Sequence, residues 1–374
     1  MNKRFAFSVF CPTARRDVML ALCLAVCTVA PKLFAQERKS ILIEFDAPGA
    51  VNGTNGWAIN PAGVVFGAYQ DANYVGHSFL RAPDGHFTTF DPPGAANGSG
   101  PVGYTPTAIN PQGEVTGIYT DASYDSHGYL RTPEGGFTTI DAPGAALGGC
   151  CIAGTEPISI NTAGAITGYY FDVNAIVHGF VRERDGNFTT FEAPGAGTGV
   201  FDGTYATSID PAGIVVGDYE PGAHGFLRAA DGNFTSFDPP GSTFTVPESI
   251  GPAGVVAGYY RDANFVFHGF LRASDGVLTT FDAPGAGIGT NYNQGTSAFG
   301  INPAGVITGY YVDASNVAHG YLRARDGAFT TFDAPDAATD YNGGTFAVSI
   351  NPADVITGFY YDADFVPHGF VRIP

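Results

Sequence analysis

Cysteine is scarce in this 374-residue sequence, which contains only five. Three of these lie in the first 35 residues, and the other two, Cys150 and Cys151, are adjacent. One adjacent pair cannot form a disulfide framework, and the sequence offers no further soft ligands at the spacing of a zinc or redox site. We therefore expect the pair to lie in one exposed loop, and we expect no metal ion and no cofactor.

Basic residues are also few. Residues 1–35 contain five of the 17 basic residues and one of the 35 acidic residues, so the rest of the chain has 12 basic and 34 acidic residues and a net charge of −22. A surface this acidic repels nucleic acid and anionic lipid. We therefore expect neither of them as a partner.

Long apolar runs are missing after residue 35. Residues 18–30 form a 13-residue apolar stretch that follows four basic residues and precedes a small residue, Ala35. This layout predicts a signal peptide over residues 1–35, since the stretch is too short for a stable membrane span. No later segment could span a bilayer, so we expect a secreted or periplasmic monomer with a single domain over residues 36–374.

What the sequence has in abundance is repetition. Seven of its eight histidines start the same short phrase, as in His-Gly-Phe-Leu-Arg, and the phrases recur every 44 to 51 residues. These histidines are His77, His127, His178, His224, His268, His319 and His368. A period of this size indicates one small structural unit copied seven times.

Each copy is typical of four short antiparallel strands, which we call A to D. In the first copy, a turn at residues 60–63 follows strand A, and strand B covers residues 64–69. Strand C begins at His77, and a turn at residues 83–85 leads to strand D at residues 87–91. β-Branched and aromatic residues fill the strands, whereas Gly, Pro, Asn and Asp fill the turns.

The ends of the chain predict how the copies assemble. Residues 41–49 look like a strand D that precedes the first copy, and the sequence ends in a strand C at residues 368–372 with no D after it. Sheets that stack radially cover both faces of each sheet, and a strand from the other end of the chain removes the unpaired edge. We therefore predict an all-β fold, a seven-bladed β-propeller with four antiparallel strands per blade, closed by the N-terminal strand.

The C–D hairpin predicts a register. A three-residue turn places Phe79 opposite Thr89 and therefore His77 opposite Asp91. The same count gives one pair in every copy: His77 with Asp91, His127 with Asp141, His178 with Glu192, His224 with Asp238, His268 with Asp282, His319 with Asp333, and His368 with Asp46. A histidine beside a carboxylate is a common acid–base pair, but seven equivalent pairs on outer strands do not converge on one point, as catalysis requires. We interpret them as structural pairs that align the hairpins.

Two other repeated features have a structural and a functional interpretation. Every strand C carries one arginine: Arg81, Arg131, Arg182, Arg228, Arg272, Arg323 and Arg372. We expect a repeated structural bond, for example to a carboxylate of a neighbouring loop, with a ring of anion sites as the alternative. Segments such as Asp-Ala-Asn at residues 71–73 are similar to part of a calcium loop, but they lack its terminal Glu and central Gly, which favours Asx-type turns.

The D–A connections vary in length, whereas the hairpins do not. From the acid that ends strand D to the head of the next A–B turn, the distance ranges from 13 to 20 residues. In a four-stranded blade the D–A and B–C loops lie on the same face, where we expect ligand recognition, with neutral drift as the alternative. The variable residues of this face are Tyr104, Cys150, Cys151, Phe201, Tyr205, Tyr292 and Tyr341.

The phrase Ile-Asn-x-x-Gly-x-Ile-x-Gly-Tyr, followed by His-Gly-Phe-Leu-Arg, resembles the bacterial extracellular repeats of the HAF family, named for a His-Ala-Phe core. The resemblance covers residues 41–374, but Gly, or Ser78 in the first copy, replaces the Ala, and Arg replaces the usual Trp. It implies an extracellular repeat protein and no established activity. A Phe-x-x-Pro motif is also similar to streptogramin lyase propellers, although none of that family's catalytic residues can be placed on this sequence.

Together these patterns favour a secreted, non-enzymatic binding or structural module. We expect it to recognise a glycan or a protein at the cell envelope through the variable-loop face. The alternative is a propeller enzyme, a lyase or hydrolase, with its site at the mouth of the central channel. An enzyme should have one copy with polar residues of its own facing the axis, and the shortened fourth copy, with Asp218, Glu220 and His224, is the first candidate.

Overall fold

The computed structural model describes residues 40–96, 105–148, 154–289 and 294–374 of the chain. They belong to one compact unit, Lys39–Pro374. All regular elements of these residues are β-strands, and none of them is a helix that could cross a membrane. The chain is therefore all-β over the described residues, and the expected signal peptide lies outside them.

The strands occur in the order that the repeats predict. The A strands are β2 (Thr54–Ile59), β6 (Thr105–Ile109), β10 (Gly154–Ile160), β14 (Gly203–Ile209), β18 (Phe244–Ile250), β22 (Gly295–Ile301) and β26 (Gly344–Ile350). The B strands are β3 (Val65–Gln70), β7 (Val115–Thr120), β11 (Ile166–Phe171), β15 (Val215–Glu220), β19 (Val256–Arg261), β23 (Ile307–Val312) and β27 (Ile356–Tyr361).

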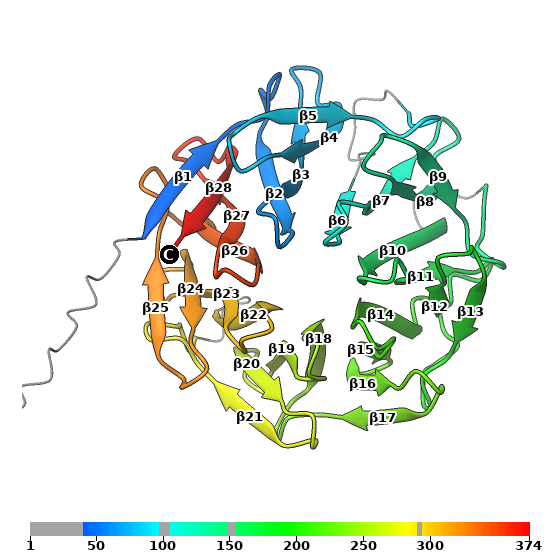
Figure 1. Ribbon diagram of the computed structural model, residues 1–374. Coiled ribbons are helices and arrows are strands. Elements are labelled where there is room, and N and C mark those ends of the chain that lie inside the picture. Colours follow the sequence, from blue (N-terminus) through cyan, green and yellow to red (C-terminus); the bar gives the residue numbers. More distant parts are fainter. Residues whose placement is uncertain (1–39, 97–104, 149–153, 290–293) are drawn as a thin grey trace, which may run out of the picture. The chain divides into compact units, whose positions relative to one another are not determined.

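The remaining strands form the outer hairpins. The C strands are β4 (Gly76–Arg81), β8 (Ser126–Arg131), β12 (Val177–Arg182), β16 (His224–Arg228), β20 (Phe267–Arg272), β24 (Ala318–Arg323) and β28 (Pro367–Ile373). The D strands are β1 (Ile41–Phe45), β5 (Phe87–Phe90), β9 (Phe137–Ile140), β13 (Phe188–Phe191), β17 (Phe234–Phe237), β21 (Leu278–Phe281) and β25 (Phe329–Phe332). In Figure 1 the A strands lie nearest a common centre and the D strands lie farthest from it.

Within each repeat the strands pair antiparallel in the order A, B, C, D. The C–D register follows the count from the turn, because Phe79 lies opposite Thr89 and Arg81 lies opposite Phe87. The turn itself closes with the N–H of Ala82 donating to the carbonyl of His86 (2.8 Å). Short turns with glycine in the left-handed region thus set which side chains face each other across the outer hairpin.

The two ends of the described chain meet in one sheet. Strand β1 pairs antiparallel with β28, with Glu44 opposite Phe370 and Phe45 opposite Gly369. Single parallel pairs, such as Val177 with Gly203, join some C strands to the next A strand. These links produce two 12-stranded sheets and one four-stranded sheet, so the hydrogen bonds do not run through one continuous closed sheet.

The core lies between consecutive repeats. One cluster joins Phe45 and Val371, from the first and last strands of the chain, to Val65 and Phe79 of the first repeat. The next cluster joins Phe66 of the first repeat to residues of the second. Because every sheet is covered on both faces, its strands carry apolar residues without a simple alternation.

The strand-C arginines do not bind carboxylates, and that expectation is wrong. Among the described residues none of the seven has a carboxylate partner at ion-pair distance; the guanidinium of Arg131 instead lies over the ring of Phe90, 4.4 Å from its centroid. Five others stack in the same way on the last ring of the preceding strand D: Arg81 on Phe45, Arg228 on Phe191, Arg272 on Phe237, Arg323 on Phe281 and Arg372 on Phe332. Arg182 has Ile140 at the corresponding position of strand D. Six of the seven strand-C arginines therefore contact the core through cation–π interactions.

The A–B turns are linked by side-chain amides. The Nδ2 of Asn351 donates to the carbonyl of Asn60 (3.2 Å), and the Nδ2 of Asn161 donates to the carbonyl of Asp210 (3.0 Å). At the corresponding positions of the fourth and fifth repeats stand Asp210 and Gly251, which have no side-chain amide to donate. The chain of amide bonds is therefore interrupted there.

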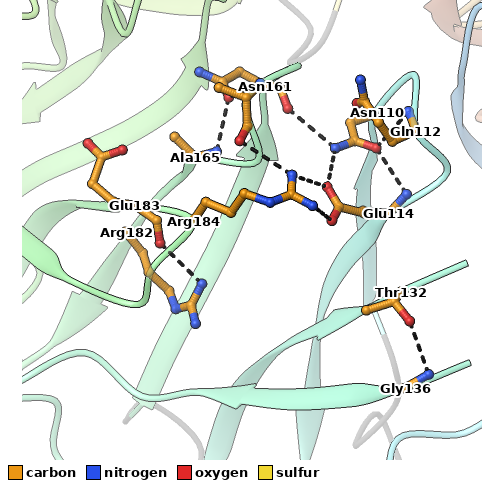
Figure 2. Close-up of polar contacts among 11 residues, drawn as sticks. Asn110, Gln112, Glu114, Thr132, Gly136, Asn161, Ala165, Arg182, Glu183 and Arg184 are labelled. Carbon is orange, nitrogen blue, oxygen red and sulfur yellow. Dashed lines mark hydrogen bonds and ion pairs between the residues drawn. The ribbon is translucent and has the colours of Figure 1, made fainter.

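One ion pair reinforces the same set of turns. Arg184, from a C–D turn, contacts Glu114 (Figure 2), and its Nη2 lies 2.7 Å from Oε1 of Glu114. The other carboxylate oxygen of Glu114 accepts a hydrogen bond from Nδ2 of Asn110 (2.7 Å). Glu114 is buried, and Arg184 supplies its counter-charge while Asn110 donates a hydrogen bond to it.

Candidate functional site

The D–A loops and the B–C turns contact each other on one face of the described unit. The N–H of Phe201, in a D–A loop, donates to the carbonyl of Ala175, in a B–C turn (2.8 Å). The N–H of Asn342 donates in the same way to the carbonyl of Asn316 (2.9 Å). We call the surface formed by these loops and turns the variable-loop face.

Three of the seven predicted binding residues can be placed on this face. Phe201 and Tyr341 are exposed, whereas Tyr205 is half-buried and its hydroxyl donates to the carbonyl of Phe201 (2.8 Å). The structure brings Phe201 and Tyr205 together in one cavity, but it does not place Tyr341 there. The other four, Tyr104, Cys150, Cys151 and Tyr292, lie outside the described residues.

An uncharged cavity of about 340 Å³, which we call the aromatic pocket, opens among the fifth, sixth and seventh repeats. Its lining comprises Tyr259, Phe267, Ser297, Phe299, Tyr310, Val312, Asn316, Ala318, Asn342, Gly343 and Phe346. The rings support one another: Phe299 stacks on Tyr310 with centroids 5.2 Å apart, and Tyr310 meets Phe346 edge-on at 4.9 Å. The polar side chains in its lining carry two amides and three hydroxyls, so the pocket offers stacking surfaces together with neutral hydrogen-bonding groups.

A second cavity, of about 500 Å³, lies at the fourth repeat, and we call it the acidic pocket. Its lining comprises Tyr169, Val200, Phe201, Asp202, Tyr205, Thr207, Asp218, Glu220, Phe244 and Val246. It shares no lining residue with the aromatic pocket. Three carboxylates and four aromatic rings therefore surround one space.

Asp218 is the buried carboxylate of the acidic pocket. It lies on β15 directly opposite Tyr205 of β14, and only 8% of its surface is exposed. Burial, together with the negative charges of Glu248 and Glu220, raises the pKa of Asp218 well above its usual range. Burial and the nearby Asp218 likewise raise the pKa of Tyr205 to about 12.

A third cavity, of about 340 Å³, lies among the ends of the A strands and is lined by residues of all of them. Glu248 of β18 is the one charged residue among those that line it. Burial raises the pKa of Glu248 to about 7. A carboxyl group that changes its charge near neutral pH is suited to proton transfer. Glu248 could therefore act as a general acid or base, which the uncharged residues of the cavity could not do at neutral pH.

A comparison between repeats shows how unusual these two acids are. The positions that correspond to Asp218 hold Ala68, Ile118, Tyr169, Tyr259, Tyr310 and Phe359. The positions that correspond to Glu248 hold Trp57, Thr107, Ile158, Thr207, Phe299 and Val348. Each acid therefore stands where six other copies carry an uncharged residue.

The histidine pairs are in contact in every repeat. The distance from Nδ1 to the nearest carboxylate oxygen is 3.0 Å for His77–Asp91, 2.7 Å for His127–Asp141 and for His224–Asp238, and 2.9 Å for His268–Asp282, His319–Asp333 and His368–Asp46, and His178 also contacts Glu192. The hydrogen bond to Asp282 raises the pKa of His268.

Each imidazole also contacts neighbours on its other sides. Tyr69 stacks on His77 with ring centroids 4.9 Å apart, and Nε2 of His77 lies 3.9 Å from Asp71. Oδ1 of Asp71 accepts hydrogen bonds from the N–H groups of Asn73 and Val75, as in an Asx-type turn. The pairs occur once per repeat on outer strands, and the structure does not bring them to a common point.

Several residues of the pockets were not singled out from the sequence, chiefly Glu248, Tyr259, Phe299, Tyr310 and Phe346. They belong to strands A and B, and the corresponding positions of other copies hold apolar, aromatic or β-branched residues that are typical of a core. A position-by-position comparison of the seven copies is the signal that could have found them, because it exposes an acid or a ring at a position where the other copies differ.

No protein-family model matches the chain, and no curated protein matches it. Among solved structures, selenomethionine-substituted virginiamycin B lyase from Staphylococcus aureus has a TM-score of 0.58 at 14% identity, covering 90% of this chain and 100% of that chain. A catalytically inactive variant of that lyase with quinupristin, also from Staphylococcus aureus, has a TM-score of 0.57 at 13% identity, with the same coverage. A structure from a study of two prolyl endopeptidases has a TM-score of 0.50 at 12% identity, covering 87% of this chain and 47% of that chain.

These neighbours are β-propeller proteins, so the chain has a propeller-like all-β fold. At this level of identity the likeness is one of fold, and it does not favour an enzyme over a binding protein.

Proposed function

We propose that the chain is a secreted seven-bladed β-propeller of the HAF repeat type, with β1 completing the last blade and residues 1–35 removed as a signal peptide. The pairing of β1 with β28 supports the role of the N-terminal strand. The cavity that is lined by the A strands of all repeats supports a common axis. The apolar stretch at residues 18–30 supports export.

We further propose that the protein is a non-enzymatic binding module for a glycan, held on the variable-loop face. The observation that carries this proposal is the aromatic pocket, in which rings and neutral polar groups meet without a charged side chain. The C–H faces of a sugar ring pack on aromatic faces, while its hydroxyls exchange hydrogen bonds with amides such as those of Asn316 and Asn342. A cavity of about 340 Å³ has the size of a site for one or two sugar rings.

The test is a glycan array probed with the purified protein, followed by calorimetry with the best glycan. Tyr310→Ala removes the central ring of the pocket and should weaken binding at least about tenfold, as expected for a buried aromatic anchor. Tyr310→Phe keeps the ring and should bind within a few-fold of the parent. Tyr124→Ala, at an exposed tyrosine outside the pocket, is the matched control. Selective binding of a protein in place of any glycan, or full binding by Tyr310→Ala, contradicts the proposal.

The second candidate is an enzyme, a lyase or hydrolase, with its acid–base group in the central cavity. Glu248 favours it, because it is the one charged residue among those that line that cavity and has a pKa of about 7. Turnover of chromogenic glycosides or esters that depends on one group titrating near pH 7, and that Glu248→Gln abolishes, would establish this candidate. Equal background rates for the parent and Glu248→Gln would remove it.

A further inference from the structure

The acidic pocket has walls suited to a cation. Tyr169 and Tyr205 lie with their ring centroids 5.0 Å apart at an angle of 64°, so they present surfaces in different directions. The hydroxyl of Tyr205 is held by the carbonyl of Phe201 (2.8 Å), which ties the loop residue to the strand. Phe244 adds a fourth ring. The faces of aromatic rings carry partial negative charge and attract ammonium groups, most strongly where water is excluded.

Two of the three carboxylates of the pocket already have hydrogen-bond donors. Oδ2 of Asp202 accepts from the N–H of Gly199 (3.1 Å), and Oε2 of Glu220 accepts from the N–H of Ala223 (3.1 Å). These bonds to backbone N–H groups fix the positions of both side chains in the lining of the pocket.

Asp218 differs from them. It is buried and lines the pocket, and the described residues give it no ion-pair partner; its carboxylate accepts a hydrogen bond from its own N–H. The buried Glu114 shows what the same protein does elsewhere, since it has Arg184 2.7 Å away. Burial without a counter-charge disfavours the ionised form of Asp218, which is why its pKa is raised, and a cation bound beside it would favour ionisation.

The other repeats show that packing does not require an acid at this position. Six copies fill it with a methyl group, an aliphatic chain or an aromatic ring. A residue that breaks the local pattern without benefit to the fold marks a functional position.

The surrounding charges favour an organic cation from outside over a cation of the protein itself or a metal ion. The guanidinium of Arg261, whose ring partner Phe244 lines the pocket, is stacked between Phe244 (5.2 Å) and Phe265 (5.1 Å) and makes no ion pair with Asp218. Within the described part of the chain, no group of three or more His, Cys, Asp or Glu side chains is arranged to hold a metal ion. The net charge of −22 after residue 35 draws cations toward the surface.

We propose that the acidic pocket binds an organic ammonium ion, with Asp218 as the counter-charge and the rings of Tyr169, Phe201, Tyr205 and Phe244 as a cage. The cavity of about 500 Å³ accommodates an alkylammonium group with its substituents. The acidic pocket and the aromatic pocket share no lining residue, so this proposal does not depend on glycan binding in the aromatic pocket.

The experiment measures the binding of choline to the purified full chain by calorimetry at low salt. The neutral compound 3,3-dimethylbutan-1-ol has nearly the same shape and serves as the uncharged comparison. We expect one saturable choline site, no measurable binding of the alcohol, and weaker choline binding as salt is added. Equal binding of both compounds, or no saturable binding of choline, overturns the proposal.

Two variants locate the site. Asp218→Asn keeps the shape and removes the charge, and Asp218→Tyr installs the residue that three other repeats carry; both should weaken choline binding at least about tenfold. Asp84→Asn, in an exposed C–D turn, should bind choline like the parent. Tyr310→Ala should also bind choline normally, so that a failed glycan test and a failed choline test can be told apart. Unchanged choline binding by Asp218→Asn overturns the assignment, and thermal melts of each variant verify that it is folded.

Discussion

His368 and Asp46 are 322 residues apart in the sequence, yet Nδ1 of His368 lies 2.9 Å from Oδ1 of Asp46. The same contact occurs between neighbouring strands of a single hairpin in the other repeats. In the last repeat it joins the first and last described strands, β1 and β28, and Phe45 of β1 packs in the core cluster of the first repeat. The N-terminal strand therefore belongs to the structural core.

The first prediction concerns this strand. Phe45→Ala should lower the free energy of unfolding by about 3–5 kcal/mol, because it leaves a cavity beside Phe79 and removes the ring under Arg81. Ile41→Ala, at an exposed position of the same strand, should change it by less than about 0.5 kcal/mol. Urea denaturation measures both, and equal effects of the two substitutions would show that β1 is not packed in the core.

The second prediction concerns Arg182, the one strand-C arginine that has an isoleucine, Ile140, where the other six have a phenylalanine ring. Arg131 and Arg182 are equally buried, and each donates from Nη1 to the carbonyl of the next residue, but Arg131 has the ring of Phe90 beneath it where Arg182 has Ile140. Arg131→Met should therefore cost about 1 kcal/mol more than Arg182→Met. Urea midpoints of the two variants give the difference, and a larger loss for Arg182→Met would contradict the cation–π explanation.

The third prediction concerns pH. The pKa of Glu248 rises from its ordinary 4.5 to about 7 on folding, so its protonated form favours the folded state. This contribution is complete below pH 4.5 and is lost as the pH rises through about 7, by at most about 3 kcal/mol. His268 and His319, whose pKa values are raised by hydrogen bonds to Asp282 and Asp333, lose their contributions in the same direction as the pH rises above 6.5.

Thermal melts between pH 4.5 and 8 measure this effect. The melting temperature of the parent should fall as the pH rises, and Glu248→Gln should remove part of that fall while leaving the parts due to Asp218, whose pKa burial also raises, and to the histidines. A parent protein whose stability increases steadily with pH over this range would show that the acid is not held in its neutral form.

The fourth prediction explains the glycine of the repeated phrase. A Cβ atom on Gly179 would lie 2.4 Å from the ring of Phe191, the residue opposite it on strand D. Gly179→Ala should therefore cost about 1–3 kcal/mol through overpacking. At Gly136 the nearest atom would lie at 3.4 Å, so Gly136→Ala should be close to neutral. Urea denaturation compares the two, and a neutral Gly179→Ala would show that the ring can move aside.

Most of the backbone could be predicted from the sequence because turn residues and strand residues alternate clearly in every copy. The three-residue C–D turn was enough to give the register, and with it the residues opposite each histidine. The aromatic rings that contact the strand-C arginines could not be predicted, because they belong to the preceding repeat. A cation–π partner is uncharged, so no complementary charge in the sequence indicates it. Four predicted binding residues lie outside the described residues and remain predictions: Tyr104, Cys150, Cys151 and Tyr292.

The candidate sites were harder to predict. Loop variation predicts Phe201 and Tyr205 on the variable-loop face, and both line the acidic pocket there. The fourth copy is singled out by Asp218, Glu220 and His224 as the first candidate for an enzyme site at the axis, and the two acids line the acidic pocket. The rings of the aromatic pocket were missed, since an aromatic residue within a strand looks like core until the contacts between repeats are known. Their function depends on which neighbours the next repeat supplies, and a single copy does not contain that information.

The difference between the outer and inner strands has a consequence for how such proteins diversify. The outer C–D hairpins are nearly identical copies, whereas the acids and rings that distinguish one repeat from another lie on strands A and B. A substitution on an inner strand of one copy leaves the other six hairpins intact. We therefore expect related genes to acquire new ligand preferences through one or two codons in a single copy, with the unaltered copies preserving a record of the residue that was replaced.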